Sequence, residues 1–291
     1  MANHHPLLKT ITLTALALLA FAANSVICRL ALGNHAIDAS TFTVLRLLSG
    51  SIVLLLLMTS MKKNTAVNPT KGSWGASFML FLYAVTFSYA YITLDTGTGA
   101  LILFAAVQIT MVVLSIISGN RLRFNEWLGA IIAFSGFVYL ILPRVTAPSM
   151  TGFFLMTVAG IAWGIYTLQG RNSTNPLMDT AYNFFRTTPF IVLLALITIN
   201  NHTSASWEGI VWALLSGGLT SGIGYTVWYI ALQGLSSTLA AVLQLSVPVI
   251  AALGGVLFVS EEISVRLIVS TFIVLGGILV VILGQAPRKS N

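Results

Sequence analysis

Residues 11–30 read ITLTALALLAFAANSVICRL, a stretch of twenty residues in which Arg29 is the only charged side chain. A helix needs about 20 mostly apolar residues to cross the hydrocarbon core of a bilayer, and this stretch has that length. Runs of the same kind recur at 43–61 and around 153–168. The sequence therefore predicts an all-α integral membrane protein whose first spanning helix contains residues 11–30.

The composition of the whole chain agrees with this prediction. Of its 291 residues, 57% are hydrophobic and 7% are charged, whereas soluble domains carry about 25% charged residues. Ten transmembrane helices account for most of the chain and leave no room for a separate soluble domain. The ten predicted spans are 8–31, 39–61, 73–93, 98–118, 125–142, 150–169, 180–199, 207–231, 237–258 and 264–284.

The basic residues predict how the chain is oriented. The net charge is +7, but the Lys and Arg residues sort by side of the membrane and form no patch for nucleic acid. Nine lie on the side of the N-terminus, and only Arg144 and Arg266 lie in the opposite loops. We therefore expect a multi-pass protein of the inner (plasma) membrane with both termini in the cytoplasm. The nine are Lys9, Lys62, Lys63, Lys71, Arg121, Arg123, Arg171, Arg288 and Lys289.

The two halves of the chain resemble each other. At a shift of 140 residues Arg46 falls on Arg186, and the same shift aligns the predicted helix boundaries. We interpret 1–145 and 146–291 as two five-helix repeats of one membrane domain, the second inverted because five is odd. Inverted repeats are common in transporters, with the substrate bound between the repeats, although channels and membrane enzymes also arise by duplication. Further pairs are Phe42 and Tyr182, Thr86 and Thr226, Tyr89 and Tyr229, Thr98 and Thr238, and Gly136 and Gly276.

One feature of the first span imitates a processing signal. The string AFA at 20–22 follows an apolar run with Lys9 before it, as at a signal-peptidase site. The run is long for a signal peptide, and its removal would destroy the repeat. We therefore interpret it as a spanning helix.

Four local patterns carry a resemblance to a known family. They are AWGIY at 162–166, the early arginines of the second and seventh spans, the segment 248–262, and the paired glycines at 276–277. Over nearly its whole length the chain resembles the drug/metabolite transporter superfamily, in its ten-helix EamA branch. The resemblance implies transport of a small metabolite, and the YddG-type aromatic amino acid exporters are the relatives that it suggests.

Aromatic side chains at helical spacing are the first candidates for a substrate site. Tyr83 and Phe87 lie one turn apart on a face of the third span. Trp163 and Tyr166 share a face of the sixth span, and Trp228 belongs to an aromatic cluster in the eighth. Binding pockets combine apolar walls with a few polar groups, so we expect these five to line a cavity. Packing between helices is the alternative role.

Three amides provide candidate polar groups. Asn24, Gln108 and Gln244 lie at membrane depth, where lipid offers no hydrogen-bond partner, so each faces a cavity or another helix. Gln244 is the favoured anchor for a substrate. Pro248, one turn later, breaks the backbone hydrogen-bond ladder and exposes carbonyl groups beside this amide.

Two arginines lie inside predicted spans. Arg46 and Arg186 are about two turns from the helix ends, and a charge at the bilayer centre costs at least about 2.5 kcal/mol, so it is retained for a purpose. One purpose is binding of a substrate carboxylate. The other, favoured by their equivalent repeat positions, is a structural bond to C-terminal carbonyls of neighbouring helices.

Small residues crowd the eighth span. Glycine and serine let helices approach closely, which suits sliding contacts in a transporter as well as static packing. The small residues are Ser216, Gly217, Gly218, Ser221, Gly222 and Gly224.

The residues argue against an enzyme. EEISVR at 261–266 matches the EExxxR string of CAAX-type membrane proteases, whose metal chemistry also needs histidines in later helices. None of the four histidines, His4, His5, His35 and His202, follows the motif or lies inside a predicted span. We therefore expect no catalysis, no metal and no cofactor.

Together these patterns predict an exporter of small metabolites, above all hydrophobic and aromatic amino acids, that works by alternating access. We expect facilitative transport because no Asp, Glu or His lies well inside a predicted span to relay protons. The expected partners are a small-molecule substrate and the lipid bilayer, and the oligomeric state stays open, a monomer included. The alternatives are a passive pore and a carrier of sugar nucleotides or lipids.

Overall fold

The computed structural model describes residues 7–60, 71–117, 124–141, 148–170, 173–199, 205–235 and 243–284. Within these ranges the chain forms helices joined by short loops and turns, and they contain no strand. The all-α fold class predicted from the sequence is therefore confirmed for the described chain.

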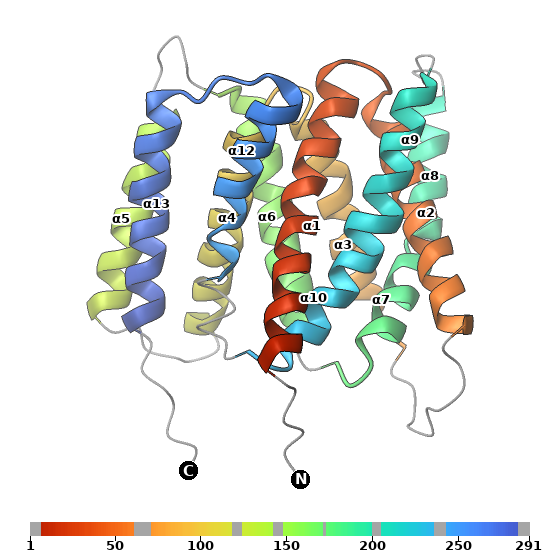
Figure 1. The fold of residues 1–291 in the computed structure, drawn as a ribbon, viewed down its shortest axis with the longest axis horizontal. Coiled ribbons are helices and arrows are strands. Elements are labelled where there is room, and N and C mark those ends of the chain that lie inside the picture. Colours follow the sequence, from red (N-terminus) through yellow and green to blue (C-terminus); the bar gives the residue numbers. More distant parts are fainter. Residues whose placement is uncertain are drawn as a thin grey trace.

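The helices follow one another up and down a single bundle (Figure 1). The first half of the described chain contributes α1 (Leu7–Gly33), α2 (Ala39–Ser60), α3 (Trp74–Ala90), α4 (Thr96–Ile117) and α5 (Phe124–Ile141). The second half begins with α6 (Met150–Gly170) and the consecutive pair α7 (Pro176–Phe185) and α8 (Thr188–Thr198). Then come α9 (Trp207–Leu215), the π-helix η2 (Ser216–Ile223), α10 (Gly224–Leu232), α12 (Val247–Val259) and α13 (Val265–Gly284).

Five helical stretches are long and apolar enough to cross a membrane, namely Leu7–Gly33, Ala39–Ser60, Met150–Gly170, Pro176–Thr198 and Trp207–Leu232. Shorter apolar helices occupy other predicted spans, among them Trp74–Ala90, Thr96–Met111, Val247–Val259 and Val265–Val280. The chain is thus a multi-pass membrane protein, and the number of ten spans stays a prediction. Residues 237–242, the start of the predicted ninth span, lie outside the described residues.

Large apolar side chains cover the outside of the bundle. Leu196, Leu257 and Phe272 are 62%, 75% and 76% exposed. Soluble monomers rarely expose wide apolar surfaces, because water does not solvate them well. Lipid is the solvent that this surface suits, in agreement with the hydropathy of the helices.

The two ends of the described chain lie at the same end of the bundle. Figure 1 shows the start of α1 and the end of α13 together at its lower edge. This arrangement agrees with termini on one side of the membrane. The identity of that side stays a prediction, and most of the basic residues behind it lie outside the described ranges.

Helices α1 and α6 organise the packing. Helices α3 and α4 pack against α6, while α12 and the continuous α9–η2–α10 element pack against α1. Helices α5 and α13 pair with each other at one edge of the bundle (Figure 1). The middle of the bundle therefore lies among α1, α3, α4, α6 and α10, where the site described below is found.

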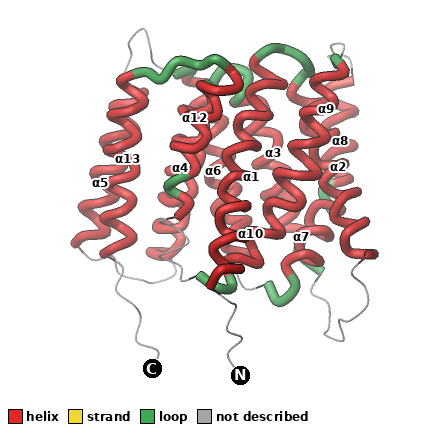
Figure 2. The backbone as a smooth tube through the Cα atoms, viewed as in Figure 1, coloured by secondary structure: helices red, strands yellow, loops and turns green. Residues whose placement is uncertain are grey.

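Proline breaks two of the predicted spans. Pro189, in the first turn of α8, cannot donate to the carbonyl of Phe185, and Oγ1 of Thr188 bonds that carbonyl at 2.6 Å instead. Pro248 lies in the first turn of α12, directly after the chain turns at 245–246. Figure 2 shows these turns in green between helical segments. The break predicted at Pro248 is therefore present.

Glycine lets η2 and α2 approach until their backbones touch. A methyl group at Gly217 would collide with the carbonyl oxygen of Arg46 and the hydroxyl of Ser49. Gly50 on α2 has no room for a side chain either, because the ring of Phe184 fills the space. At this crossing the small residues of the eighth span permit the close helix approach predicted for them.

Candidate functional site

A small cavity lies among α1, α3, α4, α6 and α10, with a volume of about 10 Å3. This volume has room for about one water molecule and is too small for a metabolite. Its lining is aromatic with few polar groups. The lining residues are Phe21, Asn24, Ser25, Tyr83, Phe87, Leu103, Phe104, Trp163 and Tyr225.

Trp163 lies at the centre of the aromatic wall. Its ring centroid is 5.1 Å from that of Tyr83 and 4.5 Å from that of Tyr225. Tyr83 is in turn supported on α3 by Phe87, one helical turn away, with 5.1 Å between the ring centroids. Each such pair contributes about 0.5–1.5 kcal/mol beyond the area that it buries. These contacts hold the rings of the wall against one another.

Phe21 completes the wall from α1. Its ring centroid is 6.0 Å from that of Trp163 and 5.6 Å from that of Trp228. Tyr166, one turn after Trp163 on α6, packs against it at 5.5 Å. The aromatic residues predicted from the sequence thus lie in one cluster. Three of them line the cavity, while Tyr166 and Trp228 lie one ring further out.

Arg46 of α2 lies beside this wall and is 1% exposed. Its Nε donates to Oγ of Ser221 at 3.2 Å, and its Nη2 donates to the hydroxyls of Tyr83 at 3.2 Å and Tyr225 at 3.0 Å. The guanidinium carbon is 5.2 Å from the ring centroid of Tyr83 and 5.1 Å from that of Phe87. Its Nη1 is buried and makes no hydrogen bond among the described residues.

The charge of Arg46 has neutral surroundings. Arg29 forms ion pairs with Asp95 and Glu261, whereas no carboxylate of the described residues forms one with Arg46. Hydroxyl groups and ring faces are its partners. A buried charge that is not paired with an opposite charge is costly, because neutral groups replace its hydration only in part.

The π-helix supplies polar side chains to the same region. Ser216 and Thr220 donate to Oδ1 of Asn24 at 2.7 and 2.9 Å, while Ser221 accepts from Arg46. Asn24 is held with its Nδ2 3.5 Å from the hydroxyl of Tyr83. Turns of π-helix inside α-helices are frequent at functional sites, and this one lies against the arginine and the cavity.

The other predicted polar residues lie elsewhere. Gln108 and Gln244 are buried, but neither lines the cavity, and the Nε2 of each has no hydrogen bond in the part of the chain that the structure describes. Arg186 lies at an end of the bundle, where it donates to the carbonyl of Lys71 and lies over the ring of Trp74 at 5.6 Å. Arg46 and Arg186 hold equivalent sequence positions but have different surroundings.

Several lining residues are absent from the candidates named on sequence grounds: Phe21, Ser25, Leu103 and Phe104. Tyr225 belongs to the aromatic cluster of the eighth span, with Trp228. Phe104 matches Gln244 at the 140-residue shift, and of this pair only Gln244 is predicted as a site residue. For single apolar residues such as these, the sequence does not distinguish a position in a cavity wall from one in a packed core.

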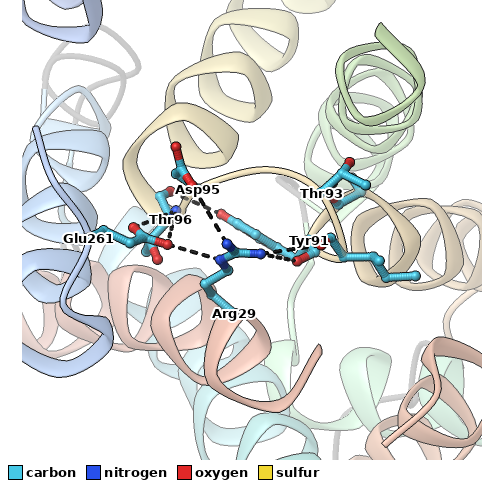
Figure 3. A network of polar contacts seen from close by, with 8 residues as sticks. Arg29, Tyr91, Thr93, Asp95, Thr96 and Glu261 are labelled. Carbon is cyan, nitrogen blue, oxygen red and sulfur yellow. Dashed lines mark hydrogen bonds and ion pairs between the residues drawn. The ribbon is translucent and has the colours of Figure 1, made fainter. Parts of the chain in front are cut away.

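A second polar cluster lies where α3 ends and α4 begins (Figure 3). Arg29 of α1 donates from Nε to Oε1 of Glu261 at 3.0 Å, and its Nη2 is 3.6 Å from Oδ1 of Asp95. Its Nη1 donates to the carbonyls of Tyr91 at 3.2 Å and Ile92 at 3.3 Å. The bond to helix C-terminal carbonyls, one of the roles considered for the arginines of the second and seventh spans, is made here by Arg29.

Glu261 also caps α4. Its two carboxylate oxygens accept the backbone N–H of Thr96 at 3.1 and 2.9 Å. The first N–H groups of a helix lack intrahelical partners, and the helix dipole favours negative charge there. One carboxylate therefore ties the loop between α12 and α13 to α1 and to the start of α4.

The opposite end of the bundle has its own polar contacts, between the start of α3 and α7. Asp179 accepts the backbone N–H of Gly72 at 2.9 Å, and Asn183 accepts that of Ser73 at 3.0 Å. Gly72 has φ +59°, which glycine adopts without strain. Tyr83, which lines the cavity, lies part-way along α3, between the polar contacts at the two ends of this helix.

Comparisons with known proteins agree with this arrangement of helices. Residues 150–283 match the model of the EamA-like transporter family. The uncharacterized protein PA1977 of Pseudomonas aeruginosa is 46% identical to this chain, over 97% of the chain and 98% of its own length. This chain belongs to the EamA-like transporter family. It is therefore a membrane transporter.

More distant relatives of this EamA-like transporter include an uncharacterized transporter of Archaeoglobus fulgidus, 27% identical over 87% of the chain and 90% of that protein. Another is the uncharacterized transporter YoaV of Bacillus subtilis, 22% identical over 84% and 88%. A protein of known crystal structure matches with a TM-score of 0.62 at 19% identity, covering 91% of this chain and 95% of that one. That likeness concerns the fold.

The EEISVR string of this EamA-like transporter has a structural use. Glu261 is the cap of α4 and the partner of Arg29. Within the described ranges no group of three or more His, Cys, Asp or Glu side chains could hold a metal ion. His4, His5 and His202 lie outside those ranges.

Proposed function

We propose that this EamA-like transporter exports small hydrophobic and aromatic amino acids. The observation that carries the proposal is the small aromatic cavity, in which Trp163, Tyr83 and Tyr225 surround a space beside the buried Arg46. Aromatic walls bind apolar side chains, and a few polar groups orient the ligand. The same lining offers little to a phosphate-rich ligand such as a sugar nucleotide, because the described lining residues include no Lys or Arg, and Arg46 reaches them through Tyr83 and Tyr225.

Alternating access is the mechanism that this arrangement supports best. The cavity of about 10 Å3 is too small for an amino acid, so a substrate enters only after one end of the bundle opens. Polar contacts hold each end: Arg29 with Glu261 at one, and Asp179 with the backbone of Gly72 at the other. Opening of one set while the other stays formed would expose the cavity to one side at a time.

Counterflow in reconstituted vesicles tests this proposal. Vesicles loaded with unlabelled phenylalanine should take up labelled phenylalanine in a saturable manner. Trp163→Ala should lower the rate at least about tenfold, since it removes the ring at the centre of the wall, while Trp207→Ala, which changes a tryptophan 77% exposed at the start of α9, should leave it near that of the parent. Flux that rises linearly with concentration would identify a pore. Equal rates for both variants would remove the cavity from the mechanism.

A further inference from the structure

The described neighbours of Arg46 use only part of its hydrogen-bonding capacity. Four of its neighbours are the hydroxyls of Ser221, Tyr83 and Tyr225 and the ring of Phe87. These account for Nε and Nη2 and leave Nη1 as a buried donor without a hydrogen bond among the described residues. A buried donor that stays unpaired is destabilising, and more so when it carries charge. Such an atom is a place where a ligand oxygen would be stabilised.

The position of the guanidinium connects it to the cavity. Tyr83, Phe87 and Tyr225 line the cavity and also contact the guanidinium. Trp163 packs against both tyrosines and supplies an apolar surface, with ring centroids 5.1 Å from that of Tyr83 and 4.5 Å from that of Tyr225. A small displacement of the tyrosine rings would thus place one ligand in contact with the cation and the apolar wall together.

The chemistry of the lining selects the ligand class. A planar guanidinium matches a carboxylate, which accepts two parallel N–H bonds from it. The lining residues contain no Asp or Glu that would pair with an ammonium group, whereas the cation beside them has no counter-ion in the described chain. The described residues at this site therefore carry one positive charge, that of Arg46, and a negatively charged ligand group would balance it.

We propose that the Arg46 guanidinium holds the carboxylate of the transported molecule, so that the site takes apolar monocarboxylates and does not require an α-amino group. This assignment rests on the proposed function and narrows it to one chemical feature of the substrate. It also gives Arg46 and Arg186 separate roles. The first binds the ligand, and the second holds the start of α3 through the carbonyl of Lys71.

Four ligands with the same phenyl ring test the assignment on the unaltered protein. Purified transporter is titrated with L-phenylalanine, 3-phenylpropionate, L-phenylalanine amide and 2-phenylethylamine, and binding is followed by tryptophan fluorescence. The two acids should bind, and the amide and the amine should bind at least about tenfold more weakly, because neither carries the carboxylate whose hydrogen bonds with the guanidinium are strengthened by charge. Binding of phenylpropionate shows that the amino group is dispensable.

The outcomes separate this assignment from the proposed function. If the amide binds as tightly as phenylalanine, or if phenylpropionate fails to bind where phenylalanine does, the carboxylate assignment is overturned. Export of aromatic amino acids would then still stand on counterflow. If none of the four binds and counterflow is absent, both are overturned.

Variants supply a second measurement. Arg46→Lys keeps the charge but loses the planar fork, and Arg46→Gln loses both, so the ratio of acid to amide affinity should fall in the first and approach one in the second. Arg186→Gln is the matched control, since it removes the repeat-equivalent arginine at the end of the bundle, and its ratio should equal that of the parent. A merely structural role for Arg46 would change stability and leave the ratio intact.

Discussion

Two acidic residues at one end of the bundle form ion pairs with the same arginine, but we expect them to contribute unequally to stability. The side chain of Glu261 is 12% exposed and that of Arg29 19%, and Glu261 bonds both Arg29 and the backbone of Thr96. The side chain of Asp95 is 61% exposed and lies 3.6 Å from Arg29. Water screens an exposed pair strongly, so Asp95 is expected to contribute little.

Replacing each residue by its amide tests this difference. Glu261→Gln removes the charge that caps α4 and pairs with Arg29, and should lower stability by about 1–3 kcal/mol. Asp95→Asn should change stability by less than about 1 kcal/mol. Thermal unfolding of the purified variants in one detergent measures both. If Asp95→Asn lowers the melting temperature as much as Glu261→Gln does, the cap on α4 contributes no more to stability than the exposed ion pair.

At the scale of elements, the interpretation of small residues depends on which neighbour they meet. Gly217 of η2 touches the backbone of α2, whereas a methyl group at Gly276 of α13 would meet nothing within 4 Å. In the sequence both glycines stand beside a second glycine, and nothing there distinguishes them. The sequence predicts that helices crowd at such residues, but the partner at each one is set by the tertiary packing.

The two glycines give a matched pair of substitutions. Gly217→Ala forces η2 away from α2, and the overpacking should cost about 1–3 kcal/mol or more. Gly276→Ala should be neutral or stabilising by up to about 1 kcal/mol, because alanine favours the helix and space is available. Folded yield and melting temperature in detergent distinguish them. Equal effects of the two would show that the α2–η2 crossing is looser than the structure has it.

The same limit applies to the site. Helical spacing predicted that Tyr83 and Phe87 share a face, and their rings lie 5.1 Å apart. It did not predict the contact of Phe21 with Trp163, because that pair joins helices that are distant in sequence. The pattern of residues likewise does not predict that Ser216–Ile223 forms a π-helix.

For the whole molecule, spanning length and hydropathy were sufficient to predict an all-helical membrane protein and to place most of its helices. The two inverted repeats stay a prediction, and the packing is what such repeats would produce. Helices α3 and α4 of the first proposed repeat lie against α6 of the second, while α9–η2–α10 and α12 of the second lie against α1 of the first. The first helix of each proposed repeat thus packs against the third and fourth spans of the other repeat.

Energy coupling is a property of the whole molecule, and it follows from where acidic groups lie. Asp38, Asp95, Asp179, Glu208 and Glu261 all lie in loops or in the first turn of a helix. The residues that line the cavity include no Asp, Glu or His, and proton-coupled carriers use such residues as relays within the membrane. We therefore expect transport to be facilitative.

Reconstituted vesicles held at zero membrane potential test this expectation. With equal pH inside and out, a gradient of phenylalanine alone should drive its flux, because the carrier then needs no proton to return. An imposed pH gradient should not concentrate this zwitterion, since no described group at the cavity could exchange a proton with it. Asp95 is the acid to examine, as it is 61% exposed beside Arg29 at one end of the bundle. If phenylalanine accumulates when a pH gradient is imposed, and Asp95→Asn abolishes this accumulation, Asp95 carries the coupled proton. The transporter would then exchange protons for substrate, and facilitative transport would be wrong.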